Sequence, residues 1–140
     1  MIQYSKDNVN FKNKKTTDCV VRALANASGK DYKVVAQELV DIWLKTGYHI
    51  CDKHCYEKWL EQNGFIKVKQ PKKENGKKYL IIELDELISK DDSVVISCAN
   101  HLTSAINNTL VDIWDCRYKT VGNYYVKKGV KHTKKVRIEL

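Results

Sequence analysis

The sequence of 140 residues contains no apolar run of the roughly 18 residues that a membrane span requires. The first 15 residues lack the apolar stretch of a secretory signal peptide, and no segment repeats at a regular period. We therefore expect a single domain over residues 1–140, located in the cytoplasm and without a membrane partner. A chain of this length buries about two-thirds of its unfolded surface around one core.

The sequence also lacks the even number of regularly spaced cysteines that is typical of a disulfide-bonded protein. The chain has an odd number of cysteines, five, at irregular spacings. In a chain without an export signal, this pattern argues against a disulfide framework. We expect five free thiols: Cys19, Cys51, Cys55, Cys98 and Cys116.

The segment HICDKHC holds four residue types that bind zinc: His49, Cys51, His54 and Cys55. Structural zinc sites usually draw two ligands from each of two separated segments, whereas these four lie within seven residues. A closed tetrahedral site is difficult to build from so short a stretch. We therefore predict no metal site and no cofactor.

The charge is strongly one-sided, with 25 lysines and arginines against 17 acidic residues and a net charge of +8. The lysines gather in residues 11–15, 67–78 and 126–137. These segments contain no recognition-helix pattern, and aromatic residues are not interleaved with them as a base-stacking surface requires. The pattern disfavours nucleic acid as the principal ligand and favours a solvated basic surface with an acidic partner.

Apolar residues recur at helical spacing in the first part of the chain and predict helices over residues 19–27, 31–47 and 52–64. Thr17 or Asp18 is the candidate N-cap of the first helix. Gly29, Gly47 and Gly64 are typical of helix ends, because glycine adopts the left-handed conformation without strain. The sequence therefore predicts a helical half that extends to about residue 63.

From residue 64 the period changes to the alternation of strands. Strands are predicted over residues 65–70, 93–106, 109–116, 121–128 and 132–140, and a helix of one or two turns follows Asp85. The short apolar run at 79–82 precedes that helix. Helices followed by meandering strands indicate an α+β fold, with the helices packed on an antiparallel sheet formed by residues 64–140.

Two consecutive asparagines, Asn107 and Asn108, suit a two-residue hairpin turn because asparagine tolerates positive φ. In that register Ile106 pairs with Thr109. Counting outward along the strands then places three side chains on one face: His101, Asp112 and Trp114. A three-residue loop would shift the register of the two strands by one residue. Asp115, in place of Asp112, would then share a face with His101.

The sequence also predicts where two cysteines of this half lie relative to the site. Cys98 stands three residues before His101, so on one continuous strand the two would face opposite sides. Cys116 follows the acidic candidates and is expected to take no part in the site.

These pieces resemble the papain-like cysteine peptidases, which place a cysteine at a helix start and then a histidine and an Asn or Asp on a late hairpin. The matching residues here are Asp18-Cys19, His101, Asp112-Ile113-Trp114 and Gly122-Asn123-Tyr124. The Asp-Cys pair is closest to the bacteriocin-processing, C39-like branch. Residues 16–32 and 96–115 are similar to small phage-encoded proteins of this type, although the Cys-Gly-Ser-Cys-Trp run of the papain subgroup is absent.

The resemblance implies a papain-like fold and a thiol hydrolase that acts on a peptide or protein through a thioester acyl-enzyme. Cys19 would be the nucleophile, His101 the base and Asp112 the group that orients the imidazole, while Trp114 shields their contact from water. The oxyanion would be held by the backbone N–H of Cys19 and by Asn13, which stands where the family has a glutamine. For a phage-encoded chain the location would be the host cytoplasm.

Two alternatives remain open from the sequence. The first is a catalytically silent papain-like scaffold, a phage protein that binds and inhibits an acidic host protein. The second is a basic accessory protein that binds nucleic acid. Substrate, bond specificity and oligomeric state are not indicated by any motif.

Overall fold

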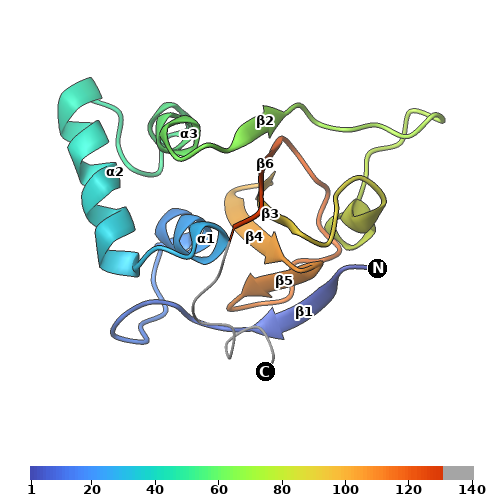
Figure 1. Ribbon diagram of the computed structural model, residues 1–140, viewed down its shortest axis with the longest axis horizontal. Helices are drawn as coiled ribbons and strands as arrows, with labels where there is room; N and C mark the ends of the chain where they lie inside the picture. Colours follow the sequence, from blue (N-terminus) through green and yellow to red (C-terminus); the bar gives the residue numbers. More distant parts are fainter. Residues whose placement is uncertain (131–140) are drawn as a thin grey trace.

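The computed structural model describes residues 1–130 and has an α+β architecture. Figure 1 shows the elements in chain order from blue to red. The helices are α1 (Cys19–Ser28), α2 (Tyr32–Thr46), α3 (Lys53–Gln62) and the 3-10 helix η1 (Ile81–Glu86). The strands are β1 (Gln3–Lys6), β2 (Ile66–Val68), β3 (Asp92–Cys98), β4 (His101–Ile106), β5 (Thr109–Asp112) and β6 (Tyr124–Lys128). The strand predicted over 132–140 lies outside the described residues.

The six strands form one mixed sheet in the order β1-β5-β4-β3-β6-β2. All neighbours are antiparallel except β1, which pairs with β5 in parallel. The prediction of a purely antiparallel sheet was therefore wrong. A strand of four residues shows too little alternation to be recognised, and its partner lies more than 100 positions along the chain. The helical part of the sequence thus contributes an edge strand to the sheet.

The three long helices begin and end close to the predicted positions. Gly29 and Gly47 adopt φ of 75° and 83° at the ends of α1 and α2, which confirms their role as stops. The short helix was misplaced, because η1 begins at Ile81 and contains Asp85 instead of following it. Its start is held by Glu83, whose carboxylate accepts a hydrogen bond from Leu80 N–H.

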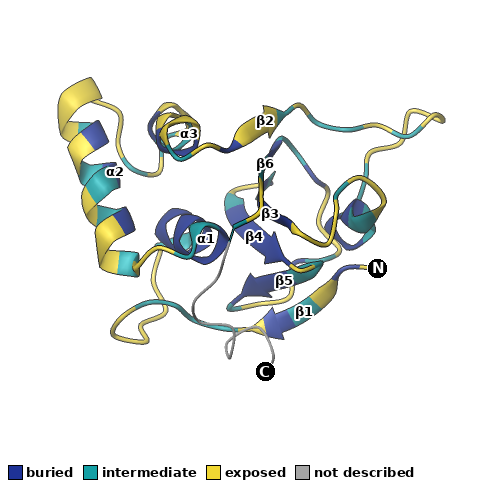
Figure 2. Cartoon of the chain, viewed as in Figure 1, coloured by how far each residue is buried: buried dark blue, intermediate teal, exposed yellow. Residues whose placement is uncertain are grey.

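Helix α1 lies between the sheet on one side and α2 and α3 on the other (Figure 1). Its residues from Val20 to Ala27 are all buried, so the helix is dark blue along this length in Figure 2. One apolar cluster joins Leu24 of α1 to Leu39 of α2, Trp59 of α3 and Leu102 of β4. This packing fixes the start of α1 against the sheet.

A second apolar cluster covers the other face of the sheet, where Ile81 and Leu84 of η1 pack against Val94 and Ile96 of β3. Burial on both faces explains why β3 reads as a nearly continuous apolar run. None of the helices in the described part of the chain has the length and apolar character needed to cross a membrane.

Candidate active site

Cys19 is the first residue of α1 and is partly exposed. Asp18 occupies the N-cap position, but its side chain makes no capping hydrogen bond. Its carboxylate instead accepts hydrogen bonds from Arg22 Nε at 2.9 Å and from the Tyr32 hydroxyl at 2.7 Å. Cys19 therefore stands at a positive helix end that the Asp18 carboxylate does not cap.

The hairpin of β4 and β5 has the predicted register. Asn107 and Asn108 have φ of 51° and 53°, as a two-residue turn with two positive φ values requires. Ile106 pairs with Thr109, and the ladder continues in step to Ser104 and Val111. In this register the side chains of His101 and Asp112 lie on the same face of the hairpin.

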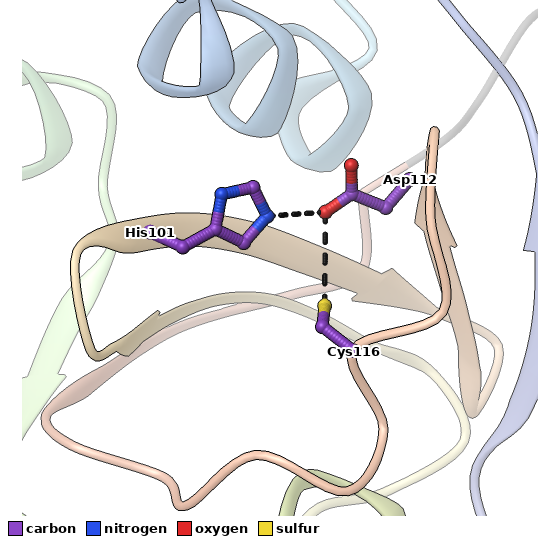
Figure 3. Close-up of side chains that lie close together, drawn as sticks. All are labelled: His101, Asp112 and Cys116. Atoms are coloured by element: carbon purple, nitrogen blue, oxygen red, sulfur yellow. Dashed lines mark hydrogen bonds and ion pairs between the residues drawn. The ribbon is translucent and has the colours of Figure 1, made fainter.

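His101 and Asp112 are in direct contact, with 2.7 Å between Nε2 and Oδ2 (Figure 3). The same carboxylate oxygen accepts a hydrogen bond from the Thr103 hydroxyl at 2.6 Å, and Oδ1 accepts one from Ile113 N–H at 2.7 Å. Asp112 is buried, with only 5% of its surface exposed. Its orientation is therefore determined by two donors on β4 and one on the segment after β5.

Asp115 was the alternative acid, and the structure places it elsewhere. Its two carboxylate oxygens accept hydrogen bonds from Arg117 Nε and Nη2, each at 2.9 Å, near the surface. Trp114 lies beside His101 as predicted, with 5.1 Å between the ring centroids, but 40% of its surface is exposed. The indole therefore covers one side of the imidazole and is not part of the core.

Cys19 and His101 both line one groove of about 640 Å³ between the start of α1 and the turn that joins β3 to β4. Tyr56 of α3 and Trp114 contribute aromatic walls. Apart from Arg22, the other lining side chains are uncharged: Thr16, Thr17, Val20, Cys51, Ser97, Cys98, Asn100, Leu102 and Ile113. The groove therefore offers a largely neutral surface around a thiol and an imidazole.

The surroundings of Cys19 favour its thiolate. Burial raises the pKa of the thiol, but hydrogen bonding with the His101 ring and with the backbone of Leu102, together with the charges of His101 and Arg22, holds the net pKa below its ordinary value. The pKa of Cys51, another thiol of the groove, is shifted the opposite way, because burial and the nearby Cys19 raise it.

The surroundings of His101 favour its protonated form. Burial lowers the pKa of the ring, but hydrogen bonds with Asp112, Cys116 and Cys19 raise it well above the ordinary value. Burial raises the pKa of Asp112, yet its hydrogen bonds with His101 and Thr103 bring it below the ordinary range. These shifts favour the thiolate of Cys19, the imidazolium of His101 and the carboxylate of Asp112.

Arg22 is a part of the site that the sequence analysis missed. It lies one turn after Cys19 and is buried, with its Nε bonded to Asp18 and its Nη1 3.7 Å from Asp112 Oδ1. The spacing of Asp18 and Arg22, four residues apart at a helix start, was the available signal for the first contact. The second contact joins α1 to β5 and has no signature in the local sequence.

Asn13 is not brought to the groove. It lies in an exposed loop with φ of 53°, its backbone N–H bonds to Asn10 O, and it is not among the lining residues. Thr16 and Thr17 occupy the part of the groove wall before the helix. The structure therefore gives no support to the amide of Asn13 as an oxyanion donor.

The expectations for Cys98 and Cys116 were wrong. A turn at residues 99–100 separates β3 from β4, so Cys98 is the cross-strand partner of His101 and faces the same side. Cys116 is buried and its thiol lies 3.8 Å from Asp112 Oδ2. The prediction for Cys98 assumed that residues 93–106 form one strand with side chains on alternate faces. It was wrong because these residues form two strands.

Within residues 1–130, one group has the ligand types and proximity of a metal site, namely His101, Asp112 and Cys116, whose ligand atoms lie within 4.8 Å of one another. Oδ2 of Asp112 already accepts from His101 and Thr103, and the guanidinium of Arg22 opposes a second cation. The group therefore fits a proton-transfer site better than a metal centre.

The four potential ligands of HICDKHC do not converge. His49 packs against Trp43, and His54 stacks on Tyr48 while bonding to Asp52. The remaining two are cysteines in different environments: Cys51 is exposed in the groove, and Cys55 is buried against Leu39 O.

Comparison with known proteins gives no further identification: no family model, no curated protein and no solved structure matches this chain.

Proposed function

We propose that this chain is a small papain-like thiol hydrolase that cleaves a peptide or isopeptide bond through a Cys19-His101-Asp112 triad. One observation carries the proposal: Cys19 and His101 line the same groove, and the imidazole is held from behind by a buried carboxylate. An isolated buried cysteine is usually an inert apolar residue. A thiol with a lowered pKa at a helix start, facing an imidazole that a third group orients, is the arrangement of an activated nucleophile.

The reaction would proceed in two stages. The Cys19 thiolate attacks the carbonyl carbon of the substrate, and the negative charge moves to the carbonyl oxygen, which the N–H groups at the start of α1 stabilise. His101 then gives its proton to the leaving nitrogen, the carbon–nitrogen bond breaks, and a thioester remains on Cys19. Water, deprotonated by His101, hydrolyses the thioester and regenerates the thiolate.

Asp112 would stabilise the imidazolium and keep its Nε2 occupied, so that Nδ1 is the nitrogen available to Cys19. Trp114 lies against the ring and limits the access of water to this contact. The substrate would be a peptide or protein, and the net charge of +8 favours one that is acidic.

The test is selective alkylation. At pH 6 to 7, iodoacetamide should modify Cys19 at least ten times faster than Cys51, because the pKa of Cys19 is lowered and that of Cys51 is raised. Cys51→Ala is the matched control, since it removes a thiol from the same groove and should leave the rate at Cys19 unchanged. Equal rates at the two cysteines would contradict the proposal and favour a scaffold used only for binding.

A further inference from the structure

Arg22 is the one permanently charged side chain that lines the groove, yet it is 95% buried and does not reach out to a ligand. It projects from the turn of α1 that follows Cys19. Nε donates to Asp18 Oδ1 at 2.9 Å, and Nη1 lies 3.7 Å from Asp112 Oδ1. One guanidinium therefore spans two carboxylates that stand about 90 residues apart in sequence.

We propose that Arg22 is a positioning residue, whose guanidinium ties the carboxylate behind His101 to the helix end that presents Cys19. The inference rests on the proposed function, which it deepens. Burying an arginine is costly unless its charge is balanced, and a buried arginine that balances two acids at once restricts the position of both. The helix and the hairpin are thereby held at a constant separation at the site.

The geometry distinguishes the two contacts. The Nε contact is a hydrogen bond, whereas Nη1 makes no hydrogen bond within the described residues and faces Asp112 through charge alone. Asp112 Oδ1 is meanwhile occupied by Ile113 N–H. Arg22 thus stabilises the ionised form of Asp112 without displacing the donors that set its orientation.

A second consequence concerns the thiol. The charged and titratable groups around Cys19 come from three directions: Arg22 from α1, His101 from β4, and Cys51 and Tyr56 from α3 and the segment before it. Of these, Arg22 and His101 are positive and stabilise a thiolate. Arg22 cannot deprotonate in a protein, so its contribution persists at every pH at which the enzyme is folded.

The experiment measures the rate of Cys19 alkylation by iodoacetamide against pH, using the full chain. In Arg22→Gln the midpoint should move to higher pH, because a cation near the thiolate is lost. Arg22→Lys keeps the charge and should retain the native midpoint. Arg117→Gln is the matched control, since it removes a partly exposed arginine that pairs with Asp115 and does not line the groove.

The bridging role has its own readout in nitrogen NMR of the His101 ring. Lysine cannot span both carboxylates, so the Nε2–H signal should shift in Arg22→Lys as well as in Arg22→Gln, and should stay in place in Arg117→Gln. A native midpoint in Arg22→Gln, or a native ring signal in Arg22→Lys, would overturn the proposal.

The proposal can still be tested if the Arg22 variants do not fold. In the native protein a guanidinium held between two carboxylates should show resolved, slowly exchanging side-chain N–H signals for Arg22, and averaged signals would overturn the proposal. Failure of the proposed function is distinct, since it appears as equal alkylation of Cys19 and Cys51 in the native chain.

Discussion

Two helix starts of this protein use the same residue types and do different things. At the start of α3, Asp52 accepts a hydrogen bond from His54 N–H at 2.8 Å and pairs with the His54 ring at 2.9 Å. These residues are near the surface and satisfy one another locally. At the start of α1, Asp18 leaves its own helix uncapped and bonds to Arg22 and Tyr32.

The comparison teaches what separates a candidate site from a cluster of reactive residue types. Aspartate, histidine and cysteine within a few residues of each other, as in HICDKHC, can be satisfied by a helix cap and a surface pair. Cys19 instead lines a groove with His101, whose ring pairs with a buried aspartate of the same hairpin, β4–β5. The backbone and ring of His54 lower the pKa of Asp52 locally, whereas burial and partners on other elements shift the pKa values of Cys19 and His101.

The largest expected effect is on activity. Cys19→Ala should abolish formation of the thioester and reduce hydrolysis by at least about 1,000-fold, because the nucleophile is removed. Cys51→Ala, at the other helix start, should retain activity. The thioester is detected by mass spectrometry after rapid acid quenching, and a variant without Cys19 that still forms it would refute the assignment.

The next effect is on stability. Asp112→Asn should lower the free energy of unfolding by about 3–5 kcal/mol, since it removes the buried carboxylate that pairs with the His101 ring and lies 3.7 Å from the Arg22 guanidinium. Asp52→Asn alters an exposed pair and should change the urea midpoint far less. Similar losses in the two variants would mean that the buried network does not differ energetically from the surface pair.

The pH dependence of stability should also separate the two regions. The raised pKa of His101 contributes stability that is complete below its unfolded pKa of about 6.5 and is lost as pH rises toward the folded value. The lowered pKa of Asp112 contributes stability that is complete above about pH 4 and is lost on acidification.

The contribution of this pair is therefore greatest between about pH 4 and 6.5. The difference in unfolding free energy between the native chain and His101→Gln should peak in that window. His54→Gln is the control, because it removes an exposed aspartate–histidine pair. A difference that is constant from pH 4 to 9 would show that the His101–Asp112 contact does not depend on charge.

The smallest expected effect comes from removing the N-cap of α3. Asp52→Ala removes a capping hydrogen bond and should lower the melting temperature slightly, as loss of an exposed helix cap does. The rate of Cys19 alkylation should not change, because Asp52 does not contact the triad. A changed rate would show that the two helix starts are coupled.

The fold was predictable where the signal was local. Periodicity found the three long helices, and glycines marked the ends of two of them by their left-handed conformation. The parity argument placed His101 on the same face as Asp112, the acid that contacts it, because the Asn107-Asn108 turn determines the register of the hairpin. It failed for Cys98, where the turn between two strands was not recognised.

Contacts between distant segments were not predictable. The parallel pairing of β1 with β5, the approach of Arg22 to Asp112 and the contact of Cys116 with the same carboxylate join parts of the chain without a shared pattern. Asn13 shows the converse, since a spacing carried over from a resemblance did not bring its side chain to the groove.

The sequence by itself determined which residues form the three long helices, which face of the hairpin carries the imidazole and the carboxylate, and which thiol begins a buried helix. These properties follow from periods of 3.6 and 2 and from turn residues, all of which act over a few positions. Only the tertiary structure decided that this thiol and this imidazole share a groove, and that a buried arginine joins the helix to the acid. Those contacts depend on how α1 packs against the sheet, which is set by the summed burial of many apolar side chains and not by any single motif.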